Sequence, residues 1–276
     1  MLAEATAAAN SKAQAIAAIR QASAATGSDF NYLLGTAMRE SSLQSSAKSS
    51  TSSATGLFQF IDQTWLGLVK KYGAEHGLSS YAAAIGQDSS GRYQADNPAD
   101  RQAILALRND PAVSAMMAGE YTNETKACME NALGRNVCGG ELYAAHFLGP
   151  DRACRLIEMS ESQPQASAAD AFPTAAAANR SVFYNADGSS KTVKQVYDWA
   201  TRQPNAAKAV DFSEAAPAAT AKPVVYNYNL SSGEPFAMLT DTPFCALPQS
   251  AFALTPGIVG ILASLSPDGR DENAKI

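Results

Sequence analysis

Residues 30–41 read FNYLLGTAMRES, and residues 54–60, which follow a loop rich in serine, read ATGLFQF. In the first stretch, the apolar side chains share the i, i+3, i+4, i+7, i+8 spacing of one helix face: Phe30, Leu33, Leu34, Ala37 and Met38. Ser28 and Asp29 precede it as candidate N-cap residues, so a helix is predicted over residues 30–41. Gly56 can adopt backbone conformations closed to other residues, which predicts a turn that brings the chain back toward the helix end.

Similar apolar spacing predicts further helices in the first part of the chain. They are expected over residues 10–25 and 62–73, from Asn97-Pro98, from Asp110-Pro111, and over residues 141–148 and 152–159. Asp62 is the expected N-cap of the helix that carries Trp65, and Gly73 is its expected end. Residues 74–96 are predicted to be irregular. No strong two-residue alternation precedes residue 160, so the fold class is predicted to be all-α or nearly so.

The composition changes after Glu161, where alanine, serine and proline dominate. Residues 161–181 are therefore predicted to be a linker, and residues 182–200 a small ordered island. Residues 201–276 are predicted to be a largely disordered, low-complexity extension rich in alanine and proline. Residues 1–160 are the predicted helical domain.

Charge and hydropathy exclude several classes of partner. The net charge of −5 does not favour binding to nucleic acid or to an anionic membrane. The late apolar run over residues 257–265 is too short to span a bilayer. The first residues lack a basic region followed by an apolar run, so no signal peptide is visible. Either it has been removed, or export uses another route, or the protein stays inside the cell.

The chain has four cysteines, namely Cys128, Cys138, Cys154 and Cys245. They lack the paired spacing of a zinc site, and His76 and His146 are the only histidines, so no metal site is predicted. Two interpretations of the cysteines remain open. They are buried free thiols, or a Cys128–Cys138 disulfide closes a small loop, which would suit an oxidising compartment.

Glu40 is the candidate catalytic residue. It follows Leu33 by seven positions and Ala37 by three, which places it at the border of the apolar helix face. A carboxyl group that loses hydration favours its protonated form, which a general acid requires. The alternative is a solvated charge paired with Arg39 or Lys48.

The glycine turn supplies candidate groups for holding a sugar. Gln59 offers both a donor and an acceptor to a sugar amide or hydroxyl, while Leu57 and Phe58 can anchor the turn in the core. The aromatic residues Phe60, Trp65 and Tyr72 are either apolar platforms for sugar rings or, more simply, core residues.

Together, Glu40-Ser41, Gly56-Leu57-Phe58-Gln59 and Thr64-Trp65 resemble the soluble lytic transglycosylase (SLT) domain of the goose-lysozyme superfamily, of the glycoside hydrolase family 23 type. The resemblance covers about residues 28–156, and residues 74–109 look like an insertion. Phe58 replaces the usual methionine. The family's Ala-Tyr-Asn-Ala-Gly motif matches residues 145–149 only at its first and last positions, and His146 falls where the family's tyrosine approaches the catalytic acid.

The resemblance implies a lysozyme-like catalytic domain with one catalytic acid, Glu40, and no metal or organic cofactor. It implies substrate contacts from Ser41, Gly56, Leu57, Phe58, Gln59, Tyr121 and His146. For Tyr121 and His146, a role as ordinary hydrogen-bonded core residues stays open. No second catalytic carboxylate is evident among the nearest candidates, since Asp62 is expected as a cap, and Glu75, Asp88 and Asp96 fall in the inserted region.

The expected reaction is that of a peptidoglycan lytic transglycosylase, a lyase that forms 1,6-anhydro ends in the cell envelope or periplasm. The alternatives are a hydrolysing muramidase on the same fold and a non-catalytic protein of wall binding or assembly. The extension after residue 160 is interpreted either as a plain extension or as a docking segment for an envelope-spanning machine, such as a flagellum or a secretion apparatus.

Overall fold

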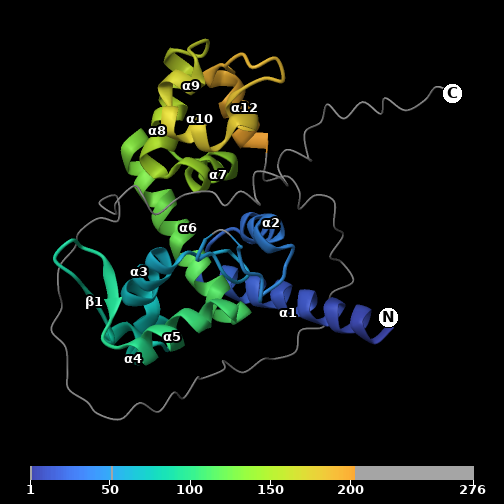
Figure 1. Cartoon of the computed structure of the whole chain (residues 1–276), viewed down its shortest axis with the longest axis vertical. Coiled ribbons are helices and arrows are strands. Elements are labelled where there is room, and N and C mark those ends of the chain that lie inside the picture. Colours follow the sequence, from blue (N-terminus) through green and yellow to red (C-terminus); the bar gives the residue numbers. More distant parts are fainter. Residues whose placement is uncertain (1, 51, 203–276) are drawn as a thin grey trace.

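The computed structural model describes residues 2–50 and 52–202, and this part of the chain is built mainly of helices, which confirms the all-α prediction. Figure 1 shows two groups of elements joined by the long helix α6 (Pro111–Leu133). The lower group contains α1 (Leu2–Thr26), α2 (Phe30–Ser41), α3 (Asp62–Tyr72), α4 (Ser79–Ala83) and α5 (Pro98–Ala106), the strands β1 (Ile85–Gln87) and β2 (Tyr93–Ala95), and the 3₁₀ turns η1 (Gly73–His76) and η2 (Leu107–Asn109). The upper group contains α7 (Gly139–Leu148), α8 (Pro150–Ser162), α9 (Ala168–Ala171), α10 (Pro173–Ala178), α11 (Arg180–Phe183) and α12 (Val193–Arg202).

The helix α2 has the predicted bounds, because both of its ends carry local signals. At its start, the Asp29 carboxylate accepts a hydrogen bond from the backbone N–H of Tyr32 at 2.7 Å. At its end, Ser42 adopts the left-handed conformation, and its backbone N–H donates to the Met38 carbonyl at 3.0 Å. The side chains of Asn97 and Asp110 similarly accept backbone hydrogen bonds at the starts of α5 and α6. These three helix starts are confirmed.

The predicted N-cap of α3 was wrong, whereas its predicted end at Gly73 is confirmed. Its N-cap is Ile61, and Asp62 is the first residue inside the helix, with no side-chain capping hydrogen bond at this end. The Asp62 carboxylate instead forms ion pairs with Arg101 and Arg108, a competing use that a cap prediction cannot anticipate. Gly73 stays right-handed, at φ −58°, and leads directly into η1.

Residues 74–96 are more regular than predicted. They contain η1, α4 and a short antiparallel hairpin in which Ile85 pairs with Ala95. The Gln63 side chain of α3 fastens this hairpin by donating to the Tyr93 carbonyl and accepting from the Tyr93 N–H, both at 3.0 Å. The Tyr93 ring also lies where a side chain at Gly67 would be.

The predicted linker over residues 161–181 was also wrong, because it is folded. It contains α9 and α10, and Ala168, Phe172 and Ala176 are buried in the same core as the rest of the chain. Alanine is small enough to let short helices approach closely. Pro173 occupies the first turn of α10, where a missing N–H is tolerated.

The predicted island over residues 182–200 is not separate from the rest. Val193, Val196 and Ala200 of α12 are fully buried in the common core, and α12 packs against α7 and α8. The predicted extension over residues 201–276 lies outside the described residues, apart from the last two residues of α12.

The Cys128–Cys138 disulfide prediction was wrong, since Cys138 is an exposed free thiol. It occupies the N-cap position of α7, where its backbone N–H donates to the Glu141 carboxylate at 3.0 Å. Cys154 is a buried free thiol, and burial raises its pKa to about 11. In residues 2–50 and 52–202, no helix combines the length and the apolar character needed to cross a membrane.

Candidate active site

Glu40 lies in the last turn of α2, with its side chain turned into the protein. Only 3% of that side chain is exposed. Its Oε1 lies 2.9 Å from Nε2 of His146, which comes from the C-terminal half of α7 and is 26% exposed. The alternative of a solvated Glu40 therefore does not describe this residue. A buried carboxyl with one oxygen held and one oxygen available is a suitable group for proton transfer.

The C-terminal end of α2 is tied to the glycine loop through Ser41. The Ser41 hydroxyl lies 3.1 Å from the Ala37 carbonyl and 2.8 Å from the Leu57 carbonyl, in positions to donate to either. A hydroxyl has one proton, so Ser41 is left as an acceptor toward any further group. The loop thus lies directly against the turn that carries Glu40.

Gly56 has two reasons to be glycine. Its φ of +85° lies in the left-handed region, and a Cβ at this position would lie 2.0 Å from the Arg108 carbonyl oxygen. Its N–H donates to the Ala47 carbonyl at 2.7 Å, which holds the loop closed. The turn predicted here is confirmed, and its rigidity comes from the contact with η2.

Gln59 also has a positive φ, of 50°, which is unusual for a residue with a side chain. Its Nε2 donates to the carbonyls of Gly56, at 2.8 Å, and of Ala47, at 3.1 Å. Its donor is therefore used to fix the loop, and its carboxamide oxygen forms no hydrogen bond with a described residue. Gln59 is thus equipped to accept a hydrogen bond from a ligand.

The apolar residues of the loop face the core. Leu57 and Phe58 are buried, so only their backbone atoms can contact a ligand. Phe60 is buried between the rings of Trp65 and Tyr121, at centroid distances of 5.5 and 6.3 Å. Burial raises the pKa of Tyr121, so its hydroxyl stays protonated at neutral pH.

Two of the aromatic residues that could form platforms for sugar rings have core or polar partners instead. Trp65 is fully buried, and its Nε1 donates to the Ile104 carbonyl at 2.7 Å. The Tyr72 hydroxyl donates to Glu124 at 2.9 Å. Both residues therefore belong to the packing of the lower group.

The contact between α2 and α7 includes residues that the sequence did not single out. The Arg39 guanidinium lies over the Tyr143 ring, 4.3 Å from its centroid, and Tyr143 stacks on His146 with an interplanar angle of 19°. The Tyr32 hydroxyl lies 3.4 Å from the Leu142 carbonyl. Burial raises the pKa of Tyr32 and that of Tyr143 to about 12, with the nearby Arg39 acting in the opposite direction.

Two carboxylates of α6, Glu120 and Glu124, have partners of their own. Glu120 binds His76 at 2.8 Å, and Glu124 binds Lys71 and Tyr72. Within residues 2–50 and 52–202, no cluster of three or more His, Cys, Asp or Glu side chains has the arrangement of a metal site.

The sequence of residues 17–98 matches a family model described as the transglycosylase SLT domain. The match includes Glu40, Ser41 and the loop over residues 56–59, and it ends before α6 and α7, which carry Tyr121 and His146. This match supports assigning residues 17–98 to the SLT family of the lysozyme-like superfamily and, at the family level, supports a lytic transglycosylase-type action on peptidoglycan.

Proposed function

We propose that this protein is a peptidoglycan lytic transglycosylase in which Glu40 is both the general acid and the general base. The observation that carries the proposal is the buried Glu40 carboxyl at the end of α2. It is hydrogen-bonded to His146, and the helix turn that carries it contacts the glycine loop. The first step needs a carboxyl group that can donate a proton.

The reaction would begin with protonation of the oxygen between N-acetylmuramic acid and N-acetylglucosamine by Glu40. The glycosidic bond breaks and its electron pair stays with that oxygen, while the acetamido group of the muramic acid stabilises the positive charge at the anomeric carbon. The Glu40 carboxylate then removes the proton of the C6 hydroxyl, whose oxygen bonds to the anomeric carbon. This step leaves a 1,6-anhydro end, restores the acid and consumes no water.

We assign His146 the role of a positioning residue. With its proton on Nε2, the imidazole donates to Oε1 of Glu40, which leaves Oε2 to carry the acidic proton toward the sugar. The stacked Tyr143 ring limits how the imidazole can turn. His146 is partly exposed, so it can also contact the substrate.

The proposed substrate contacts follow from the atoms that the fold leaves available. Gln59 offers its carboxamide oxygen, and Ser41 offers its hydroxyl oxygen as an acceptor. Leu57 and Phe58 contribute backbone atoms, and Gly56 provides the turn that exposes them. Tyr121 contributes by holding Phe60 beneath the loop, with its hydroxyl as a further candidate contact.

Digestion of purified cell wall followed by mass spectrometry tests the proposal. The unmutated chain should release fragments with anhydro ends, and Glu40→Gln should release none while keeping its circular dichroism spectrum. Glu75→Gln, which changes an exposed carboxylate of η1, is the matched control and should cleave normally. Activity retained in Glu40→Gln would contradict the assignment of Glu40.

Product analysis also separates this proposal from its alternatives. Reducing ends in place of anhydro ends would identify a hydrolysing muramidase that uses the same acid. Binding to wall with no cleavage would identify a wall-binding or assembly protein.

We further propose that the protein acts in the cell envelope, where peptidoglycan lies. A role in opening the wall for an envelope-spanning machine rests on the segment after residue 202, which lies outside the described residues. A pull-down with and without residues 203–276 tests it, and identical partner lists would argue against docking through this segment.

A further inference from the structure

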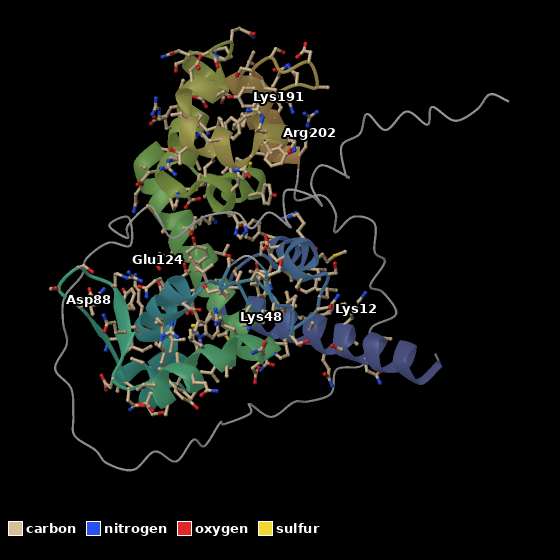
Figure 2. The ribbon with its side chains drawn as sticks, in the orientation of Figure 1. Lys12, Lys48, Asp88, Glu124, Lys191 and Arg202 are labelled. Carbon is tan, nitrogen blue, oxygen red and sulfur yellow. The ribbon has the colours of Figure 1, made fainter. Side chains whose placement is uncertain are left out.

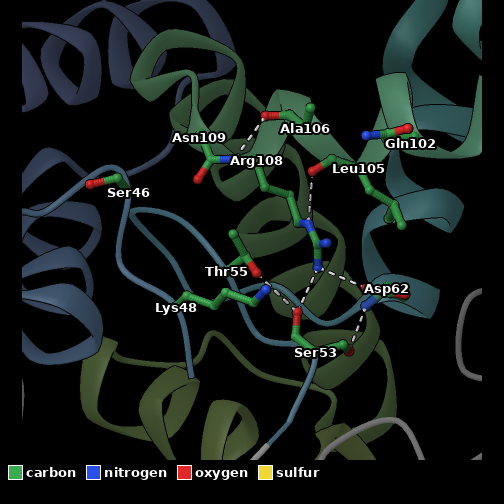
Figure 3. A pocket seen from close by; sticks show the side chains of 10 residues that line it. All are labelled: Ser46, Lys48, Ser53, Thr55, Asp62, Gln102, Leu105, Ala106, Arg108 and Asn109. Atoms are coloured by element: carbon green, nitrogen blue, oxygen red, sulfur yellow. Dashed lines mark hydrogen bonds and ion pairs between the residues drawn. The ribbon is translucent and has the colours of Figure 1, made fainter. Parts of the chain in front are cut away.

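A hollow of about 500 Å³ lies behind the glycine loop, between that loop and the α5–η2 corner. Figure 3 shows its lining, which consists of Ser46, Lys48, Ser53, Thr55, Asp62, Gln102, Leu105, Ala106, Arg108 and Asn109. Glu40 and His146 do not line it, so it is distinct from the site described above. Two of its lining residues adjoin loop anchors, since Lys48 follows Ala47 and Thr55 precedes Gly56.

Arg108 forms the floor of the hollow and is 6% exposed. Its Nε donates to the Leu105 carbonyl, and its Nη1 donates to the carbonyls of Ser53 and Phe60, at 2.8 and 2.9 Å. Within the described part of the chain, Nη2 forms no hydrogen bond. A buried guanidinium therefore presents a free pair of N–H donors to the hollow.

Lys48 forms the opposite side. Its side chain is exposed, and its amine has no hydrogen bond or ion pair with any described residue. Figure 3 shows the Lys48 amine extending toward the Arg108 guanidinium, on the side of its Nη1 atom. Two positive groups that face each other repel unless an anion lies between them.

Asp62 does not supply that anion. Its Oδ1 lies 3.0 Å from Nη1 of Arg108, and its Oδ2 binds Arg101. The single carboxylate thus pairs with Arg101 and Arg108, and the Lys48 amine adds a further positive charge to the lining of the hollow. Burial lowers the pKa of Arg108 in spite of its ion pair with Asp62, which indicates that Asp62 does not fully offset the loss of hydration.

We propose that this hollow is a binding site for a small oxyanion, which the Lys48 amine and the free Nη2 of Arg108 bind from the lining. The Ser53 hydroxyl can add a donor, because it accepts a hydrogen bond from the Asp62 N–H and its own proton is not used by a described residue. The ligand is a carboxylate, such as those of an acidic wall peptide, or a phosphate. Either would bridge the base of the loop that carries Gln59 to η2.

Nuclear magnetic resonance titration of the full chain tests the site without measuring wall cleavage. The probes are inorganic phosphate, an acidic peptide with the carboxylates of a peptidoglycan stem, and the same peptide with its carboxylates amidated. The readout is the shift of the Thr55 and Gly56 amide signals. The variant Lys48→Gln removes one of the two cations, and Lys12→Gln removes an equally exposed lysine on α1, outside the hollow (Figure 2).

Phosphate, the acidic peptide or both should shift these signals, and the probe that does so identifies the source of the oxyanion. Lys48→Gln should raise the dissociation constant about tenfold, as expected for the loss of one charge-assisted hydrogen bond. Lys12→Gln should leave it unchanged. Equal binding by the two variants, equal binding of the amidated peptide, or no shift with any probe would overturn the proposal. This binding result does not depend on the proposed enzymatic function, because it would be the same for a protein that never cleaves wall.

Discussion

The Nε2 atom of His146 lies 2.9 Å from Oε1 of Glu40, and this contact joins α7 of the upper group to the end of α2 in the lower group. The Glu40 side chain is almost fully buried, whereas His146 retains some exposure. The imidazole therefore borders the solvent, while one oxygen of the carboxyl is held in the protein interior. Substitutions of His146 and of a control histidine distinguish a functional contact with Glu40 from simple packing.

Replacing His146 with phenylalanine should lower wall cleavage by about one to two orders of magnitude, because a misdirected acid loses its alignment with the bond. His146→Tyr, which introduces the residue that the family resemblance implies, should retain much of the activity. Initial rates over a range of pH provide the measurement. The pH–rate profile of His146→Phe should differ in shape from that of the unmutated chain. A purely structural role would instead lower the rate equally at every pH.

The pair formed by His76 and Glu120 provides the control, since it has the same chemistry at 2.8 Å between η1 and α6. His76→Phe should change stability and leave the pH profile of cleavage unaltered. Equal losses in the two phenylalanine variants would show that His146 acts only through packing.

Gly56→Ala should destabilise the chain more than Gly77→Ala. Both glycines have positive φ, at 85° and 78°, so each substitution carries a backbone strain of about 1–2 kcal/mol. Only at Gly56 would the new methyl group meet the Arg108 carbonyl, at 2.0 Å, whereas nothing lies within 4 Å at Gly77. The clash should add about 1–3 kcal/mol, measured as the free energy of unfolding in urea. Equal effects of the two substitutions would contradict the close contact between loop and η2.

Much of the helical fold could be predicted because its signals are local. Asp29, Asn97 and Asp110 each cap the helix that directly follows them. The hairpin of β1 and β2 was missed because strands of this length show no alternation, and its attachment depends on Gln63, far away in sequence. The folded segment over residues 163–181 was missed because its composition resembles a linker, while its burial involves α12, which contacts α9, and Arg155 of α8, which lies over the Phe172 ring.

The candidate site divides in the same way. Glu40 and the turn at Gly56 lie close together in sequence and were identified together. The contacts of Arg39 with Tyr143 and of Tyr32 with the Leu142 carbonyl depend on how α7 lies against α2. The spacing of these residues along the sequence does not predict that orientation. For the same reason, the sequence alone left both a core role and a substrate-binding role possible for the apolar residues near them.

Glu141 should make the stability of the upper group sensitive to acid. It is 3% exposed, and although burial acts to raise its pKa, hydrogen bonds from Arg135 and from the Cys138 N–H hold that pKa below the usual range. A carboxylate with a depressed folded-state pKa stabilises the fold above the unfolded pKa of about 4.3, and this stabilisation is lost as the pH falls through the folded value. Urea unfolding measured from neutral pH downward should show this loss.

Glu141→Gln should lower stability at neutral pH by about 2 kcal/mol, as charge-assisted hydrogen bonds are lost, and should flatten the acid dependence. Glu158→Gln, at an exposed position of α8, is the control and should change stability by less than about 0.5 kcal/mol. An acid dependence that persists unchanged in Glu141→Gln would assign it to other carboxylates.

The chain should need residues 163–202 for activity, which places the end of the functional unit well beyond the predicted boundary at residue 160. The Trp199 ring of α12 packs against Phe147 and Tyr143 of α7, at centroid distances of 5.3 and 6.1 Å, and the Thr201 backbone lies against Gly140. Since α7 carries His146, loss of α12 should leave Glu40 without a fixed partner.

A chain ending at residue 202 should therefore cleave wall, and one ending at residue 162 should lose at least about tenfold in rate, because misplacement of the Glu40 partner disturbs the alignment of the acid. Trp199→Ala in the longer chain is the gentler test. It should lower the free energy of unfolding by about 3 kcal/mol and reduce cleavage with it. Tyr184→Ala removes an aromatic ring of the upper group that makes no ring contact with α7, so it should preserve cleavage. Full activity in the chain ending at residue 162 would show that α7 holds His146 in place without α12.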